Sequence, residues 1–264
     1  MVVKAEKSRG IVIAAQGNLM TVRFEGVVRQ NEVVFVKSAG LSLKGEVIEI
    51  NGNEAKIQVF EPTKGVRHGD EVEFDSDLLT VELGPGLLKR VFDGLQNPLE
   101  DIAKETGYFL PRGVYLDPLP RDIKWKWTPL AKVGETVEKA HFLGWVPEEN
   151  VEHKIMVPFS FIGKGTVKEI APEGEYTIDE EIAKIEDEKG NVLSVKMIQR
   201  WPAKFALRFG ERLLPKEQLT TSMRVIDGPF PVAKGGTFCT PGPFGAGKTV
   251  LQHQISKYAK TQVV

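Results

Sequence analysis

The sequence predicts a mixed multi-domain protein in which two β-rich modules precede the start of an α/β nucleotide-binding domain. Short alternating strands fill the N-terminal quarter, a second set of short strands rich in Gly and Pro follows, and a strand, a glycine loop and a helix end the chain. At 264 residues the chain can hold several domains. We expect a barrel over 1–74, a connecting, helical part of the nucleotide-binding domain over 75–109, an insertion over 110–200 and the nucleotide-binding domain itself over 201–264.

Composition and charge exclude several classes of protein. The formal net charge of −1 supplies no bulk attraction to nucleic acid or to an acidic membrane. No apolar run approaches the length that spans a bilayer, and the N-terminus lacks the apolar core of a secretory signal. Cys239 is the single cysteine, so it forms no internal disulfide, and we expect a buried structural thiol. These features predict a cytoplasmic protein in a reducing compartment.

Strand patterns define the expected N-terminal barrel. Polar and apolar residues largely alternate over 46–50 and 54–59, and Asn51-Gly52-Asn53 between them is a tight hairpin signal. Gly17-Asn18 joins two earlier strands in the same way. Several short strands at this spacing favour a small closed barrel.

Small barrels of this kind often bind oligonucleotides, through a basic groove with stacking aromatic side chains. Residues 1–74 instead carry ten Lys/Arg and ten Asp/Glu, with phenylalanines mostly at core-like positions. We therefore expect an assembly or capping barrel and no binding of nucleic acid.

Residues 75–107 change to helix-forming sequence. Asn97 is expected to cap a helix that begins at Pro98, with Glu100 completing a capping box. Helical spacing of Leu95, Leu99 and Ile102 gives the helix an apolar face, which we expect to pack against the nucleotide-binding domain.

Residues 110–200 contain two similar halves that flank residues 152–158. This arrangement resembles the flattened barrel, or barrel-sandwich hybrid, of biotinyl and lipoyl carrier domains, whose modified lysine lies on a hairpin at that midpoint. A carrier would present Lys154, but the sequence context that those domains usually show is absent. We expect an ordinary solvated lysine, since a shared fold does not imply a shared function.

Other side-chain types give no catalytic pattern. The four histidines lack metal-ligand spacing, so structural or exposed roles are expected, and the four tryptophans are expected to pack in cores or at domain edges. No Ser–His–Asp or Cys–His arrangement is evident. The residues are His68, His141, His153, His253, Trp125, Trp127, Trp145 and Trp201.

The strongest motif is a phosphate-binding loop. Gly242-Pro243-Phe244-Gly245-Ala246-Gly247-Lys248-Thr249 matches G-x-x-x-x-G-K-[ST] in full, and Val250 follows it. Residues 236–240 read as a short buried strand before the loop, and residues 250–259 read as a helix after it, with apolar positions 251, 255, 258 and 259 on one side. Backbone N–H groups and the helix N-terminus would hold an anion, Lys248 would reach the β- and γ-phosphates, and Thr249 would hold Mg²⁺.

These residues resemble the catalytic A subunit of V-type and archaeal A-type rotary ATPases. The resemblance runs from about residue 10 to the end, and the phosphate loop together with the 110–200 insertion distinguishes it from F-type β subunits, B subunits and secretion ATPases. Besides the loop, it rests on residues 82–88, 92–99, 153–158, 199–202 and 224–227, and on Pro231, Lys234, Gly235 and Gly236.

The resemblance implies an N-terminal barrel, an outward bulge and a RecA-like P-loop domain that binds ATP or ADP with Mg²⁺. It implies an alternating A3B3 ring with B subunits, together with central and peripheral stalks, on the cytoplasmic face of a membrane that is reached only through the ion-translocating sector. ATP hydrolysis would pump H⁺ or Na⁺, or ion flow would make ATP.

Family members continue far beyond Val264, so the resemblance also implies that the water-polarising glutamate, a further acidic residue for Mg²⁺ and the adenine pocket lie outside this sequence. The expected site therefore has no complete catalytic set, and Lys248 is its transition-state contact. We expect this chain alone to bind nucleotide weakly and to hydrolyse it poorly. Two alternatives remain: another RecA-like motor, such as a helicase or terminator whose barrel grips RNA, and a non-enzymatic carrier or assembly module.

Overall fold

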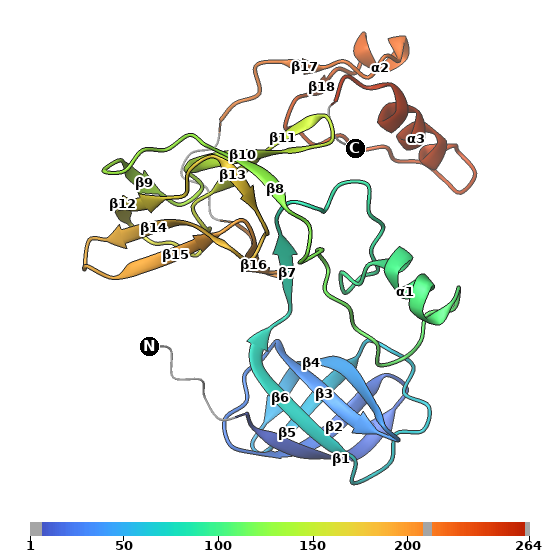
Figure 1. Cartoon of the computed structure of the whole chain (residues 1–264). Coiled ribbons are helices and arrows are strands. Elements are labelled where there is room, and N and C mark those ends of the chain that lie inside the picture. Colours follow the sequence, from blue (N-terminus) through green and yellow to red (C-terminus); the bar gives the residue numbers. More distant parts are fainter. Residues whose placement is uncertain (1–6, 208–212, 262–264) are drawn as a thin grey trace. The chain divides into compact units, whose positions relative to one another are not determined.

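The computed structural model of the chain describes residues 7–207 and 213–261, which fall into two units that divide after Ala206. The first unit holds a β-barrel, a connecting segment and a second β module, and the other holds the glycine loop (Figure 1). Within the described residues, no helix combines the length and apolar character needed to cross a bilayer.

Six antiparallel strands close the predicted N-terminal barrel, in the order β1-β2-β5-β4-β3-β6. Thirteen buried residues fill it, among them Phe24 and Phe74, whose rings meet edge to face with centroids 5.7 Å apart. The expected core role of these phenylalanines is confirmed. The strands are β1 (Arg9–Gln16), β2 (Leu19–Glu25), β3 (Glu32–Ser38), β4 (Leu41–Asn51), β5 (Glu54–Val59) and β6 (Glu71–Leu78).

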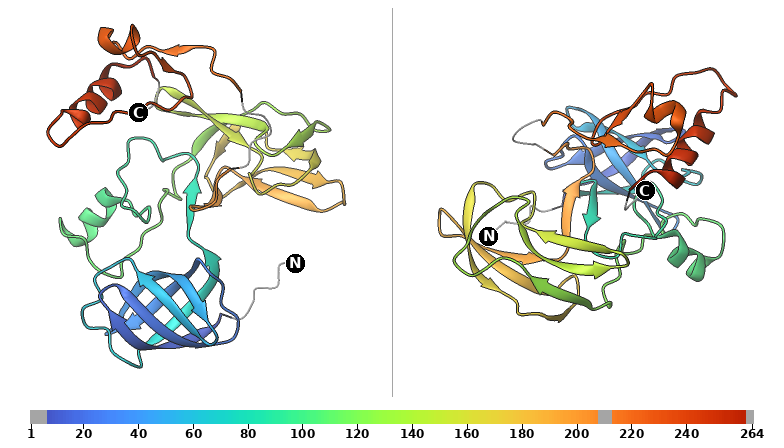
Figure 2. Two further views of the ribbon diagram at one scale, coloured as in Figure 1. Left: turned by 180° about the vertical axis from the view of Figure 1, so that it is seen from behind. Right: turned by 90° about the horizontal axis from the view of Figure 1, so that it is seen from above.

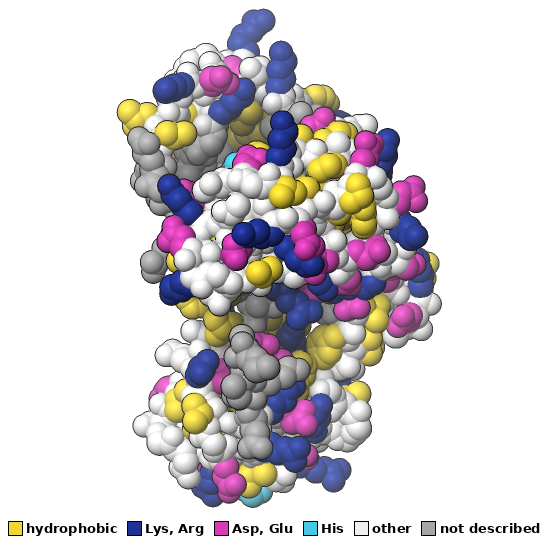
Figure 3. Space-filling model, turned by 60° about the vertical axis from the view of Figure 1, so that its left-hand side comes forward, with side chains coloured by type: hydrophobic (Ala, Val, Ile, Leu, Met, Phe, Trp, Pro, Cys, Tyr) yellow, Lys and Arg dark blue, Asp and Glu magenta, His cyan; other side chains and the backbone are white. Residues whose placement is uncertain are grey.

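Charges on the barrel surface are paired between neighbouring strands. Arg23 lies 3.1 Å from Glu54, and Lys56 lies 2.8 Å from Glu49. On the face shown in Figure 3, basic and acidic side chains are intermixed over the barrel at the bottom of the view. This pairing agrees with the equal charge counts in the sequence, and the face shown has no uniformly basic stripe.

The connecting segment contains β7 (Thr80–Leu83) and α1 (Leu99–Thr106). The predicted capping box does not form. Pro98 occupies the N-cap position with no side-chain cap, and the Asn97 amide donates instead to Asp93 at 2.8 Å. Asp93 also accepts a hydrogen bond from the Asn97 backbone N–H. The Asn97 side chain is therefore used in a local turn and does not cap the helix.

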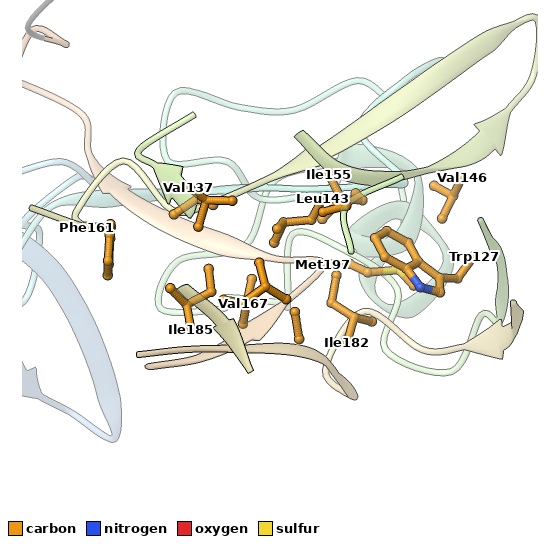
Figure 4. Close-up of a cluster of buried hydrophobic side chains, with 14 of the residues drawn as sticks. Trp127, Val137, Leu143, Val146, Ile155, Phe161, Val167, Ile182, Ile185 and Met197 are labelled. Carbon is orange, nitrogen blue, oxygen red and sulfur yellow. The ribbon is translucent and has the colours of Figure 1, made fainter. Parts of the chain in front are cut away.

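The second β module consists of two four-stranded sheets, ordered β11-β10-β8-β13 and β15-β14-β12-β9. Sixteen buried residues between Leu119 and Met197 form a core to which both sheets contribute (Figure 4). The strands are β8 (Trp125–Pro129), β9 (Thr136–Glu138), β10 (Phe142–Glu148), β11 (Val151–Met156), β12 (Lys164–Ile170), β13 (Gly174–Tyr176), β14 (Glu181–Asp187) and β15 (Val192–Lys196).

Trp127 is the largest fully buried side chain of this module, and its indole N–H donates to the Ala171 carbonyl at 3.1 Å. The expected packing role is thus confirmed for Trp127. Gly144, on the neighbouring strand, lets the ring approach closely, because a Cβ there would stand 2.3 Å from the Trp127 ring.

The module is joined to the rest of its unit by a two-stranded ribbon. β16 (Gln199–Pro202) pairs antiparallel with β7, so that Gln199 lies opposite Leu83 and Pro202 opposite Thr80. The strand that follows the module is thus paired with a strand that precedes α1 and the module.

The unit that carries the glycine loop contains two very short strands, β17 (Gln218–Leu219) and β18 (Val232–Ala233), with α2 (Arg224–Asp227) and α3 (Lys248–Tyr258). The helix expected after the loop is present. Its side with Leu251, Ile255 and Ala259 is half-buried, whereas Tyr258 is exposed and no residue of α3 is fully buried.

Two expectations for this unit are wrong. Residues 236–240 form no strand, and Cys239 is exposed rather than buried. Strand structure at this position needs neighbouring strands to pair its backbone groups, and among residues 213–261 the only strand pairing is between β17 and β18.

Candidate phosphate-binding site

The glycine loop leads directly into α3. Gly247 takes the N-cap position with φ 78° and ψ 17°, a left-handed conformation that a side chain would strain. The Leu251 N–H donates to the Gly247 carbonyl at 2.9 Å, which closes the first turn. The second glycine of the motif therefore redirects the chain, so that Lys248 and Thr249 begin the helix.

Lys248 folds back over the loop. Its ammonium group donates to the Gly242 carbonyl and, at 3.3 Å, to the Pro243 carbonyl. The structure thus brings together the first glycine of the motif and its lysine, which lie six positions apart. Thr249 and Val250, in the first turn of α3, are exposed.

Charge favours an anion at this end of the helix. The first N–H groups of a helix have no partner within it, and the helix dipole places partial positive charge there. Residues 213–261 add six Lys/Arg against two Asp/Glu. The loop therefore offers backbone donors, one lysine and a hydroxyl to a negatively charged group.

Contacts at the other end of α3 hold the helix in place. Ser222 donates through its hydroxyl to the Tyr258 carbonyl at 2.8 Å, and the Lys260 N–H donates to the Thr220 carbonyl at 3.0 Å. The Thr221 backbone and hydroxyl both donate to Asp227, and these hydrogen bonds lower the pKa of that carboxyl below its ordinary value. The 220–227 turn thus braces α3.

Lys154, expected to be an ordinary lysine rather than a carrier lysine, does not have the setting that a carrier domain requires. Lys154 lies within β11 rather than at the hairpin turn, which is formed by Glu149 and Asn150. Its ammonium group pairs with Glu152 at 2.6 Å and stands 5.8 Å from the centre of the Trp145 ring. Within the described ranges, no three His, Cys, Asp or Glu side chains are grouped to hold a metal ion.

One buried polar cluster gave no signal in the sequence. Glu148 is 4% exposed, accepts from the Gly86 and Leu88 N–H groups at 2.7 and 3.2 Å, and lies 2.6 Å from His153 Nδ1. Burial opposes its ionisation, but the hydrogen bonds from His153, Gly86 and Leu88 outweigh burial and lower its pKa. Glu148 thereby fixes the 84–88 loop to the second β module.

Comparisons with known proteins agree with both β modules. Residues 12–75 match the ATP synthase alpha/beta family, beta-barrel domain, and residues 116–204 match the ATPsynthase alpha/beta subunit barrel-sandwich domain. The predicted barrel and barrel-sandwich module are therefore confirmed, and the two ranges together cover more than half of the chain.

Relatives with similar sequences are V-type ATP synthase alpha chains. Identity is 54% with the protein of Treponema denticola over 98% of this chain, and 53% with that of Protochlamydia amoebophila over 99%. The protein of Borrelia garinii subsp. bavariensis is 53% identical over 98%. The chain spans 44–45% of the length of these relatives.

Proposed function

Because the chain belongs to the ATP synthase alpha/beta family, we propose that it acts in the catalytic subunit of a V-type rotary ATPase, with Gly242–Val250 binding ATP or ADP. The observation that carries the proposal is the loop geometry: Gly247 caps α3, and Lys248 lies over the carbonyls of Gly242 and Pro243. Residues 213–261 would be the start of a RecA-like domain.

The side chains of the loop suit a nucleotide with Mg²⁺. Lys248 would contact the β- and γ-phosphates, and the exposed Thr249 hydroxyl would be a ligand of the metal ion. When bound, Mg²⁺ would neutralise part of the charge on the phosphates. The lysine would exchange its loop carbonyls for phosphate oxygens, which form stronger, charge-assisted hydrogen bonds.

The assembly would follow that of the family. We propose B subunits in an alternating A3B3 ring, with central and peripheral stalks, on the cytoplasmic face of a membrane. ATP hydrolysis or synthesis would be coupled there to H⁺ or Na⁺ transport. The charge-paired barrel supports a protein partner over nucleic acid, since few counterions would be released by phosphate contacts.

Nucleotide binding by purified Lys248→Ala protein tests the proposal. We expect a fluorescent ADP analogue to bind the parent chain weakly and to lose at least about ten-fold in affinity in the variant, because charged hydrogen bonds to phosphate are lost. Lys260→Ala is the matched control, since Lys260 is exposed just beyond α3. Equal affinity in both variants would contradict the proposed site.

Hydrolysis is expected to be poor in this chain alone. The loop holds phosphates, but a water-orienting residue and an arginine finger, typically worth about 10³–10⁵ in rate, are needed for rapid transfer. Turnover near 1 s⁻¹ or faster, the low end for ordinary enzymes, that Lys248→Ala abolishes would contradict this expectation.

A further inference from the structure

A cavity of about 140 Å³ lies beside β11, in the first unit and separate from the glycine loop. β11 is the edge strand of its sheet, as Figure 1 shows, and the strand contributes four consecutive residues to the lining. The remaining walls come from Leu83, the last residue of β7, from Gly84 after it, from the segment between β11 and β12, and from residues of β15 and β16 and between them. They include Phe159, Lys196, Met197 and Gln199.

The titratable side chains that line this cavity are all basic. They are His153, Lys154 and Lys196, and no carboxylate lines it. A neighbouring cavity of about 500 Å³ also includes Lys196 and Gln199, but Glu82, Asp117 and Asp179 balance its cations. Among titratable groups, the lining of the smaller cavity therefore presents only cationic side chains, whose carboxylate partners Glu148, Glu152 and Asp179 lie outside it.

Several donors at this cavity lack an acceptor. His153 meets Glu148 through Nδ1, and no partner for its Nε2 occurs in the part of the chain that the structure describes. In the imidazolium form both ring nitrogens donate. Gln199 accepts from the Phe159 N–H through Oε1 at 3.0 Å, which leaves its amide N–H groups available.

The two lysines differ in how firmly they are held. Lys196 lies 3.7 Å from Asp179, which is beyond hydrogen-bond distance, and the side chains of both are 47% exposed. Lys154 is hydrogen-bonded to Glu152 at the rim. Lys196 can therefore turn toward an anion without breaking a hydrogen bond.

We propose that this cavity binds one inorganic tetrahedral oxyanion, phosphate or sulfate, through His153, Lys196 and Gln199, with Lys154 at the rim. The volume corresponds to about five water molecules at roughly 30 Å³ each, which suits a small anion rather than a nucleotide. Buried Met197 and Ile155 lower the local dielectric constant and so strengthen charge-assisted hydrogen bonds.

The test titrates sulfate into the Lys248→Ala chain, so that binding at the glycine loop does not contribute. Sulfate has a fixed charge near pH 6, and sodium chloride at equal ionic strength corrects for screening. The ring resonance of His153, identified by its loss in His153→Asn, is expected to shift saturably with sulfate alone. A linear shift that chloride reproduces would overturn the proposal.

Two variants distinguish a specific anion-binding site from a general effect of the positive charge on the protein. Lys196→Met is expected to weaken sulfate binding by at least about ten-fold, the effect of losing a hydrogen bond to a charged group. Lys164→Met is the matched control, because Lys164 also lies 3.7 Å from a carboxylate, that of Glu138, but does not line the cavity. Equal effects of both substitutions would overturn the assignment.

A competition arm identifies the source of the anion. Glycerol 2-phosphate carries the same phosphate chemistry on a bulkier group, and we expect it to displace sulfate less effectively than inorganic phosphate does. Stronger displacement by the monoester would overturn the assignment to a free inorganic anion.

Discussion

The Glu148 carboxylate accepts a hydrogen bond at 2.7 Å from the N–H of Gly86, which precedes it by 62 positions. The same oxygen accepts from Leu88, and the other oxygen faces His153. One buried acid thus joins the connecting segment to a hairpin of the second β module. The energetic role of this acid is open to direct measurement.

Replacing Glu148 by Gln is expected to lower the free energy of unfolding by about 1–3 kcal/mol, because buried N–H groups lose a charged acceptor. Urea denaturation measures the change. Glu149→Gln is the control: Glu149 pairs with Lys89 at 2.6 Å, but its side chain is 52% exposed, and such surface pairs contribute about 1 kcal/mol or less. Similar losses in the two variants would contradict the role given to Glu148.

We expect low pH to reduce the stability of the folded protein, in part through protonation of Glu148. Its folded pKa lies below the ordinary 4.5, so its contribution to stability is present above that value and is lost as pH falls through the folded pKa. We expect the urea midpoint of the parent chain to fall more steeply between about pH 5 and pH 3 than that of Glu148→Gln. Parallel pH profiles would refute this linkage.

Gly144→Ala is expected to destabilise the chain by about 1–3 kcal/mol or more through overpacking. The new methyl group would stand 2.3 Å from the Trp127 ring and 2.5 Å from the Thr128 carbonyl oxygen. Gly94→Ala is the matched control, since nothing lies within 4 Å of the corresponding position. Thermal unfolding and the fluorescence of Trp127 would report the effect, and an unchanged Gly144→Ala protein would show that this contact is not tight.

The insertion, residues 110–200, is expected to keep its β structure when expressed alone. All sixteen buried residues of its core lie between Leu119 and Met197, so the fragment retains the whole apolar interior. It loses the bonds from Gly86 and Leu88 to Glu148, which should lower its stability. Circular dichroism with a random-coil spectrum would count against an independent module.

Lys154 should carry no biotinyl or lipoyl group in protein from its native cell. The side chain is 34% exposed, pairs with Glu152 and stands over Trp145, within a strand rather than at a hairpin tip. Intact-protein mass spectrometry measures this directly. Stoichiometric acylation at Lys154 would revive the carrier hypothesis.

The elements that the sequence predicted well depend on local patterns. Alternation within 46–59 and the turn at Asn51-Gly52-Asn53 gave the β4–β5 hairpin, because adjacent residues determine both strands and their turn. The glycine loop and the helix after it were found for the same reason. Whether Lys248 and Thr249 bind nucleotide stays a prediction.

The predictions that failed concern residues whose structure depends on a residue far away in the sequence or on a competing hydrogen-bond partner. Asn97 was expected to cap a helix, but its side-chain amide donates a hydrogen bond to Asp93 instead. Residues 236–240 have strand-like composition, yet a strand forms only beside another strand, and Cys239 is exposed as a result. Nothing in the sequence linked Glu148 to Gly86, since no local period connects residues so far apart.

The β7–β16 ribbon has a mechanical consequence. Only Leu79 separates β7 from the last strand of the barrel, and β16 continues toward the unit that carries the glycine loop. Because Thr80 lies opposite Pro202 and Leu83 opposite Gln199, the strand that precedes the connecting loop pairs with the strand that follows the second β module. Tilting the module would therefore load this ribbon together with the hydrogen bonds from Gly86 and Leu88 to Glu148.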